Sequence, residues 1–201
     1  MFNHTRGLWG YTGRAPDGQP LTVQATGMGG PSTAIVVEEL IDLGARSLVR
    51  IGTCGALVEG LGLGEIVVAG HALTADGTSR ALGAGERAEA DAGLSSALAA
   101  GGLRTVTAAT ADLFYDPDAG RARGWVEAGA SVVEMEAATL FTVARLRGVA
   151  AGAVLGVTDL LAGGGRERIE GPALETLGVE LGRAGWAGLG AVGGGPTAEA
   201  G

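Results

Sequence analysis

The segment that constrains the fold most is 131–147, in which a short apolar strand passes directly into a helix, SVVEMEAATLFTVARLR. Val132 and Val133 are typical of the end of a buried strand. From Glu136 onward, apolar residues recur at three- and four-residue spacing, which is typical of a helix with one buried face. This succession predicts an α/β fold, in which ligands bind at the carboxyl ends of the strands.

Two carboxylates, Glu134 and Glu136, lie at the junction of this strand and helix. An ionised carboxylate can accept two hydrogen bonds from a vicinal diol, such as the 2′- and 3′-hydroxyls of ribose. Alternatively, both residues are acidic members of a first helical turn, where the helix dipole stabilises them. The local pattern leaves both interpretations open.

Composition excludes several classes of protein. The 201 residues are 46% hydrophobic, which suits one domain with a full core. The net charge is −8 and the basic residues are scattered, which argues against nucleic acid as a partner. Cys54 is the only cysteine, so the sequence predicts neither an intrachain disulfide nor a cysteine-based metal cluster.

No apolar run reaches the roughly 18 residues of a membrane span, so no membrane partner is expected. Asn3, His4 and Arg6 interrupt any signal-peptide pattern at the N-terminus. A cytoplasmic location is therefore the expectation.

Alternating patterns predict a single α/β domain over residues 1–190, with a mixed, twisted central β-sheet flanked by helices, followed by a flexible tail at 191–201. The Gly- and Ala-rich segment 74–93 is predicted to be a long loop. Strands are predicted at 21–25, 47–51, 65–70, 105–110, 132–133 and 150–157, and helices at 31–43, 94–100, 117–128, 137–147 and 174–189.

A glycine-rich turn, GMGGPS at 27–32, opens the first predicted helix, and its backbone can approach a ligand closely. It matches neither a Walker A loop nor a full dinucleotide-binding fingerprint. Arg50 lies within an apolar strand, where a guanidinium is costly to bury without an anion or a carboxylate partner. Therefore either Arg50 and Thr53 together bind a phosphate, or Arg50 belongs to a structural salt bridge.

Other candidates follow the ends of predicted strands. Asp159 ends the strand at 150–157, where a catalytic acid or a turn-forming residue is expected. Phe114 and Tyr115 offer flat rings that either stack on a base or pack in the core. Cys54 has no nearby histidine to activate it, which favours a buried, inert thiol.

Taken together, six segments resemble the nucleoside phosphorylase superfamily, and most strongly its bacterial, hexamer-forming purine nucleoside phosphorylases. The resemblance covers nearly the whole chain, from Arg6 to about Leu189. Uridine phosphorylases share part of it but lack the aspartate that matches Asp159. The six segments are RGLWGYTG at 6–13, GMGGPSTAIVVEEL at 27–40, RIGTCGA at 50–56, ADLFY at 111–115, VEMEA at 133–137 and VTD at 157–159.

The resemblance implies a role for each matching residue. Asp159 is expected to protonate purine N7, supported by either Arg166 or Arg168. Arg6 is expected to reach a neighbouring subunit's phosphate in a dimer-based hexamer. The other implied ligands are Arg50 and Thr53 for phosphate, Met28, Glu134, Met135 and Glu136 for ribose, and Cys54, Gly55, Phe114 and Val133 for the base.

The implied reaction is reversible phosphorolysis of purine nucleosides or deoxynucleosides to free base and (deoxy)ribose 1-phosphate, with phosphate as co-substrate. It requires no metal and no organic cofactor. The resemblance does not determine whether 6-amino or 6-oxo purines are preferred.

The chain departs from the family pattern in one respect. Family members normally carry a first strand and a Gly-Asp-Pro-x-x-Arg phosphate loop before the segment that matches Arg6, and this sequence contains no such loop. We expect Met1 to be an internal position of a longer protein, the first strand being absent. The alternatives are a degenerate paralogue that binds nucleosides without cleaving them, a nucleoside hydrolase, or a uridine phosphorylase.

Overall fold

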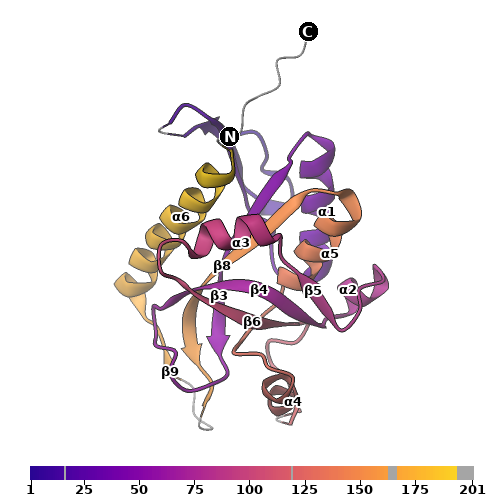
Figure 1. The fold of residues 1–201 in the computed structure, drawn as a ribbon, viewed down its shortest axis with the longest axis vertical. Coiled ribbons are helices and arrows are strands. Elements are labelled where there is room, and N and C mark those ends of the chain that lie inside the picture. The colour runs from indigo at the N-terminus through magenta and orange to yellow at the C-terminus, as the bar shows by residue number, and fades with distance from the viewer. Residues whose placement is uncertain (16, 119, 163–166, 194–201) are drawn as a thin grey trace.

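The computed structural model describes residues 1–15, 17–118, 120–162 and 167–193 and shows an α/β domain (Figure 1). A 3₁₀ turn, η1 (Thr5–Gly7), precedes the first strand. The strands are β1 (Gly10–Arg14), β2 (Pro20–Gln24), β3 (Ser47–Ala56), β4 (Ile66–Ala75), β5 (Arg87–Glu89), β6 (Arg104–Ala111), β7 (Val132–Glu134), β8 (Ala150–Leu160) and β9 (Glu167–Arg168). The helices are α1 (Gly30–Asp42), α2 (Gly77–Ala81), α3 (Ala92–Ala99), α4 (Arg121–Glu127), α5 (Ala137–Arg147) and α6 (Gly171–Gly193).

The main sheet has the strand order β5-β4-β6-β7-β3-β8-β9 and contains both parallel and antiparallel pairs. An additional antiparallel pairing of β4 with β8 joins its two halves, so that β4, β6, β7, β3 and β8 form a closed ring. Val67, Val68 and Val154 lie at this closure and are fully buried. The predicted α/β domain with a mixed sheet is therefore confirmed, and the sheet is a closed, barrel-like one.

Helices cover the sheet on two sides (Figure 1). On one side, α5 packs against α1 and against strands of the barrel, and its residues 137–144 are all buried. On the other side, α3 and α6 pack together through Leu94, Leu98, Leu177 and Leu181. A Cβ on Gly156 of β8 would come within 2.8 Å of Leu177, so this glycine allows α6 to lie close to the sheet.

The segment 74–93, predicted to be a long loop, is mostly regular structure, so this prediction was wrong. It contains the end of β4, α2, β5 and the start of α3. Asp76 and Asp91 cap the two helices by accepting hydrogen bonds from Ser79 N and Leu94 N, both at 2.8 Å. The short strand β5 forms by backbone pairing with β4, for which its polar sequence gives little local signal.

The hairpin of β1 and β2 forms a two-stranded sheet of its own, separate from the barrel. Trp9, Tyr11 and Val23 on this hairpin are each more than half exposed. Helix α6 extends beyond the predicted limit of 189 to Gly193, and the rest of the predicted tail lies outside the described residues. In the described part of the chain, no helix combines the length and the apolarity needed to cross a membrane.

Candidate active site

The candidate site is centred on Arg50, whose guanidinium contacts two carboxylates. Its Nε lies 3.1 Å from Oε2 of Glu134, and its Nη2 lies 2.5 Å from Oε2 of Glu136. All three side chains are shielded from solvent, with 14%, 0% and 6% of their surface exposed. The structure thus shows that Arg50 belongs to a buried salt bridge, one of the two alternatives that the sequence left open, while phosphate binding stays a prediction. We call these three residues the arginine–carboxylate cluster.

Gly52 provides the space in which the Arg50 side chain lies. It is two residues further along β3 and therefore on the same face of the strand. A Cβ at Gly52 would come within 2.6 Å of Nη2 and 2.7 Å of Cζ of Arg50. The Arg-Ile-Gly order in the sequence is thus a steric requirement of this arrangement.

Glu134 is buried, and both of its carboxylate oxygens accept hydrogen bonds. Its Oε2 accepts hydrogen bonds from the backbone N–H groups of Glu136 and Ala137, each at 2.8 Å, in addition to Arg50 Nε. Its Oε1 accepts one from the hydroxyl of Thr110 at 2.5 Å. Burial raises the pKa of Glu134, and the charge of Glu136 adds to this, whereas Arg50 and the hydrogen bonds act in the opposite direction. Neither glutamate belongs to the first turn of α5, but Glu134, at the end of β7, binds the backbone N–H of the first residue of that helix, Ala137.

Glu136 links the cluster to the glycine-rich turn. Its Oε1 accepts a hydrogen bond from the backbone N–H of Gly29 at 2.6 Å. Gly29 has φ of +83°, a conformation that glycine adopts readily, and it immediately precedes α1. Met28 is 85% exposed beside this turn, and Met135 is half-buried between the two glutamates. Each oxygen of Glu136 can accept one further hydrogen bond, which suits a ligand hydroxyl.

Asp159 lies at the end of β8 beside a break in strand register. Cys54 of β3 pairs with Val157 but the next residue, Gly55, pairs with Asp159, so that Thr158 is bulged. Such a bulge re-aims the neighbouring side chains. Asp159 is buried, and its Oδ2 accepts a hydrogen bond from the Thr158 hydroxyl at 2.9 Å.

An exposed arginine accompanies Asp159. Nε of Arg168 lies 3.7 Å from Oδ1 of Asp159, and the Arg168 side chain is 62% exposed. The other candidate partner, Arg166, lies outside the described residues. Arg168 thus forms an ion pair with Asp159, and the choice between the two arginines as its support stays a prediction.

Cys54 lies on β3 between β7, which carries Glu134, and β8, which carries Asp159. Burial raises the pKa of its thiol to about 12, and the charges of Glu134, Arg50 and Asp159 all act on it. A thiol with this pKa is almost entirely protonated at neutral pH, as expected for an inert structural cysteine.

Most of the remaining candidates are exposed to solvent. Phe114 and Tyr115 follow β6, are 54% and 84% exposed, and pack edge to face with ring centroids 5.0 Å apart. Thr53 is exposed on β3 and Val133 is half-buried on β7, beside the buried Gly55. Arg6 is exposed in η1 with φ of +57°, a strained conformation for a residue other than glycine.

Thr110 of β6 was not among the sequence candidates, although it contacts the cluster directly. Its only sequence signal is its place as the last hydroxyl before the ADLFY segment, in a strand that also contains Thr105 and Thr107. The backbone N–H of Gly29 was missed because main-chain donors carry no residue-specific sequence signal.

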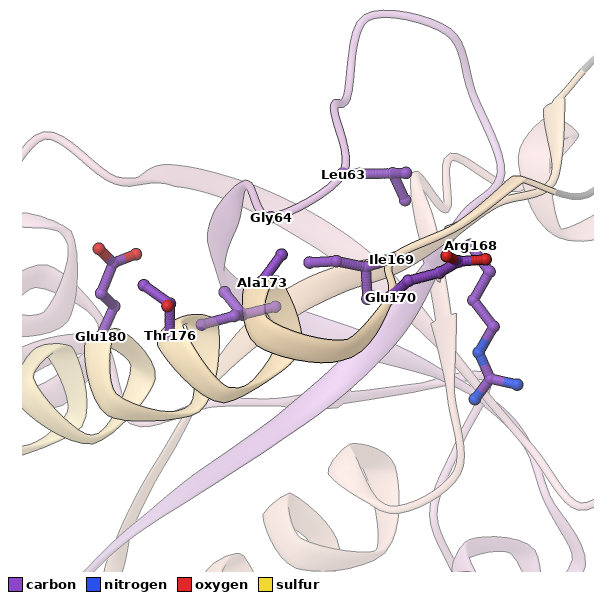
Figure 2. Close-up of a pocket in the computed structure, with 9 residues that line it drawn as sticks. Leu63, Gly64, Arg168, Ile169, Glu170, Ala173, Thr176 and Glu180 are labelled. Carbon is purple, nitrogen blue, oxygen red and sulfur yellow. The ribbon is translucent and has the colours of Figure 1, made fainter.

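A shallow groove of about 630 Å³ lies outside this site, between the 63–64 loop and the start of α6 (Figure 2). Leu63, Ile169 and Ala173 contribute its apolar part, and Glu170 and Glu180 its charged edge. Figure 2 shows the Arg168 side chain reaching away from Thr176 and Glu180. The groove and the candidate site therefore share Arg168.

The protein is thus an α/β domain in which an arginine within one strand is paired with two carboxylates at the end of a second strand, and a separate acid lies at the end of a third. The family model "Phosphorylase superfamily" matches residues 1–177, and the chain belongs to this superfamily.

Known relatives agree with this assignment. The chain is 36% identical over 178 residues to a "Purine nucleoside phosphorylase DeoD-type" of Alkaliphilus metalliredigens, covering 84% of this chain and 76% of that protein. A protein of the same name from Geobacillus kaustophilus is 35% identical over 170 residues, covering 79% and 70%. A "Guanosine phosphorylase" of Halorubrum lacusprofundi is 35% identical over 158 residues, covering 75% and 66%.

Proposed function

We propose that the chain is a purine nucleoside phosphorylase, which cleaves purine nucleosides with phosphate to release the base and ribose 1-phosphate. The observation that carries the proposal is the convergence around Cys54. Cys54 lies on β3 together with Arg50, and β3 is flanked by β7, which carries Glu134, and by β8, which carries Asp159. Anion-binding, hydroxyl-binding and acid groups thus lie on, or directly after, three adjacent strands of the sheet. The names of the relatives point to the same substrates.

In this proposal each group acts on a different part of the substrate. Arg50 and Thr53 hold phosphate, while Glu136 accepts hydrogen bonds from the ribose hydroxyls. Asp159 donates a proton to N7 of the purine as the C1′–N9 bond breaks and its electron pair leaves with the base. A phosphate oxygen then forms the new bond to C1′, which carries oxocarbenium character as in glycoside hydrolysis.

The other residues of the proposed pocket are Thr53 for phosphate, Met28 and Met135 for ribose, and Cys54, Gly55, Phe114 and Val133 for the base. Arg6 is proposed to serve a neighbouring subunit's phosphate within a dimer-based hexamer in the cytoplasm. Its exposure on η1 is compatible with that role. Light scattering of the purified protein would test the oligomer, and a monomer would contradict it.

A second function, nucleoside binding without phosphorolysis, is favoured by the charge balance of the cluster. One guanidinium faces two carboxylates, so that ionised Glu134 and Glu136 leave no net positive charge for a phosphate dianion. A phosphorylase therefore needs either a proton on the cluster or a further cation supplied to it.

The deciding experiment measures base release from inosine, adenosine and guanosine, with and without phosphate. Release that depends on phosphate supports the proposed function. Release without phosphate indicates a hydrolase, whereas binding without release supports the second function. Asp42→Asn, which changes an exposed carboxylate on α1, is a matched control for variants of Asp159.

A further inference from the structure

We propose that Thr110 is a positioning residue for phosphate, which acts through Glu134 to orient the guanidinium of Arg50. The inference rests on the proposed function and adds to it a residue that does not touch the substrate. It also assigns Glu134 a different role from ribose binding. Three steps of geometry support it.

The first step is the bonding of Thr110 itself. Its side chain is fully buried on β6, next to Glu134 of β7 in the parallel register. The hydroxyl donates to Oε1 of Glu134 at 2.5 Å and accepts from the backbone N–H of Ala138 at 2.9 Å. With one donor and one acceptor contact, its orientation is defined in both directions.

The second step concerns Glu134, which has no exposed side-chain surface to offer a ligand. Its Oε2 accepts three N–H groups, from Arg50 Nε and from the backbone of Glu136 and Ala137. Thr110 is the side chain bonded to the other oxygen. Loss of the Thr110 hydroxyl would leave Oε1 buried without this donor, so the carboxylate would turn to recover a partner.

The third step is the effect at Arg50. Glu134 binds Nε and Glu136 binds Nη2, and these two contacts fix the orientation of the planar guanidinium. Within the described residues, Nη1 has no hydrogen-bond partner and remains for a ligand. A turn of the Glu134 carboxylate would rotate this plane and move Nη1 away from its anion.

The test compares Thr110→Val, which replaces the hydroxyl by a methyl group, with Thr110→Ser, which keeps the hydroxyl. Thr142→Val is the matched control, because Thr142 is almost as buried and, among the described residues, its hydroxyl bonds to Ala138 O of its own helix, at 2.7 Å. We expect Thr110→Val to raise the KM for phosphate about tenfold, the effect of losing one buried hydrogen bond. The KM for nucleoside should remain unchanged, and Thr110→Ser should restore the phosphate KM.

A second readout does not depend on turnover. Hydrogen exchange at Arg50 Nε, followed by NMR, reports directly on the contact with Glu134. We expect this exchange to accelerate in Thr110→Val and to stay slow in Thr110→Ser and Thr142→Val. If the chain proves not to be a phosphorylase, this measurement still decides whether Thr110 orients Arg50.

Two results would overturn the inference. One is an unchanged Arg50 Nε exchange rate in Thr110→Val. The other is an equal rise of the phosphate and nucleoside KM values in Thr110→Val and in Thr142→Val, which would mean that both threonines only stabilise the fold. Failure of the proposed function is distinguished from both, because it appears as absence of phosphate-dependent release in the unmodified chain.

Discussion

The two halves of the candidate site differ in how their charged groups are held. In the arginine–carboxylate cluster, Arg50 is 14% exposed and is held between two buried carboxylates. At the other half, Arg168 is 62% exposed and lies 3.7 Å from Asp159. Buried contacts set the first arrangement before any ligand arrives, whereas the exposed Arg168 can adjust when a base binds. The half around Arg50 is thus preorganised and the half around Asp159 is adaptable.

The largest difference between the two halves is expected when each arginine is replaced in turn. Arg50→Met should lower the free energy of unfolding by about 3–5 kcal/mol, because it leaves two buried carboxylates without their cation. Arg168→Met should cost less than about 1 kcal/mol, as expected of an exposed pair. Urea unfolding measures both. Equal losses from the two variants would show that the halves are not held differently.

Removing the acid should separate activity from stability. Asp159→Asn should lower kcat for purine nucleosides by about 10²–10⁴-fold, since general acid catalysis contributes that much. The free energy of unfolding should change little, because the amide keeps the size of the carboxylate. Steady-state kinetics with inosine measure the first effect. Unchanged activity would show that another group protonates the base.

The space reserved for Arg50 provides a steric test. Gly52→Ala should destabilise the fold by about 1–3 kcal/mol, the usual cost of overpacking. The added methyl group would come within 2.6 Å of the guanidinium. Gly62→Ala is the control, because no atom lies within 4 Å of a Cβ at that position. A loss in Gly52→Ala no larger than in Gly62→Ala would mean that the Arg50 guanidinium moves without cost.

The smallest expected effect is on the pH dependence of stability. Because the native state raises the pKa of Glu134 above its ordinary 4.5, the folded protein binds that proton more tightly than the unfolded chain. The free energy of unfolding should therefore fall as the pH rises from 4.5 through the raised pKa, by at most about 1.4 kcal/mol per pH unit. Glu134→Gln should remove this component, so thermal unfolding curves of the two proteins across pH should diverge. Parallel curves would contradict the assignment.

Much of the site was predictable because its residues follow recognisable local patterns. Arg50 was detectable as a charge inside an apolar strand, and Glu136 as a carboxylate where a strand becomes a helix. Asp159 was detectable at the end of an apolar run. Each of these signals is local, so no knowledge of strand pairing was needed to find them.

The partners of these residues were not predictable in the same way. Arg50 and Glu134 are 84 positions apart in the sequence, and their contact depends on the antiparallel pairing of β3 with β7. The same holds for Thr110, which reaches Glu134 because β6 lies beside β7. A glutamate that binds a helix N-terminus and one that binds ribose have the same local sequence, so the contacts of each glutamate could not be predicted from it.

By itself, the sequence determined the alternation of strands and helices, the mixed α/β class and the membership of the superfamily, because periodicity and motif order are properties of neighbouring residues. Only the tertiary structure decided the closure of the barrel, the regular structure of segment 74–93 and the pairing of Arg50 with two carboxylates. The physical reason is that strands pair through backbone N–H and C=O groups, which are nearly the same for every residue type. Register and burial are set by the packing of the whole domain.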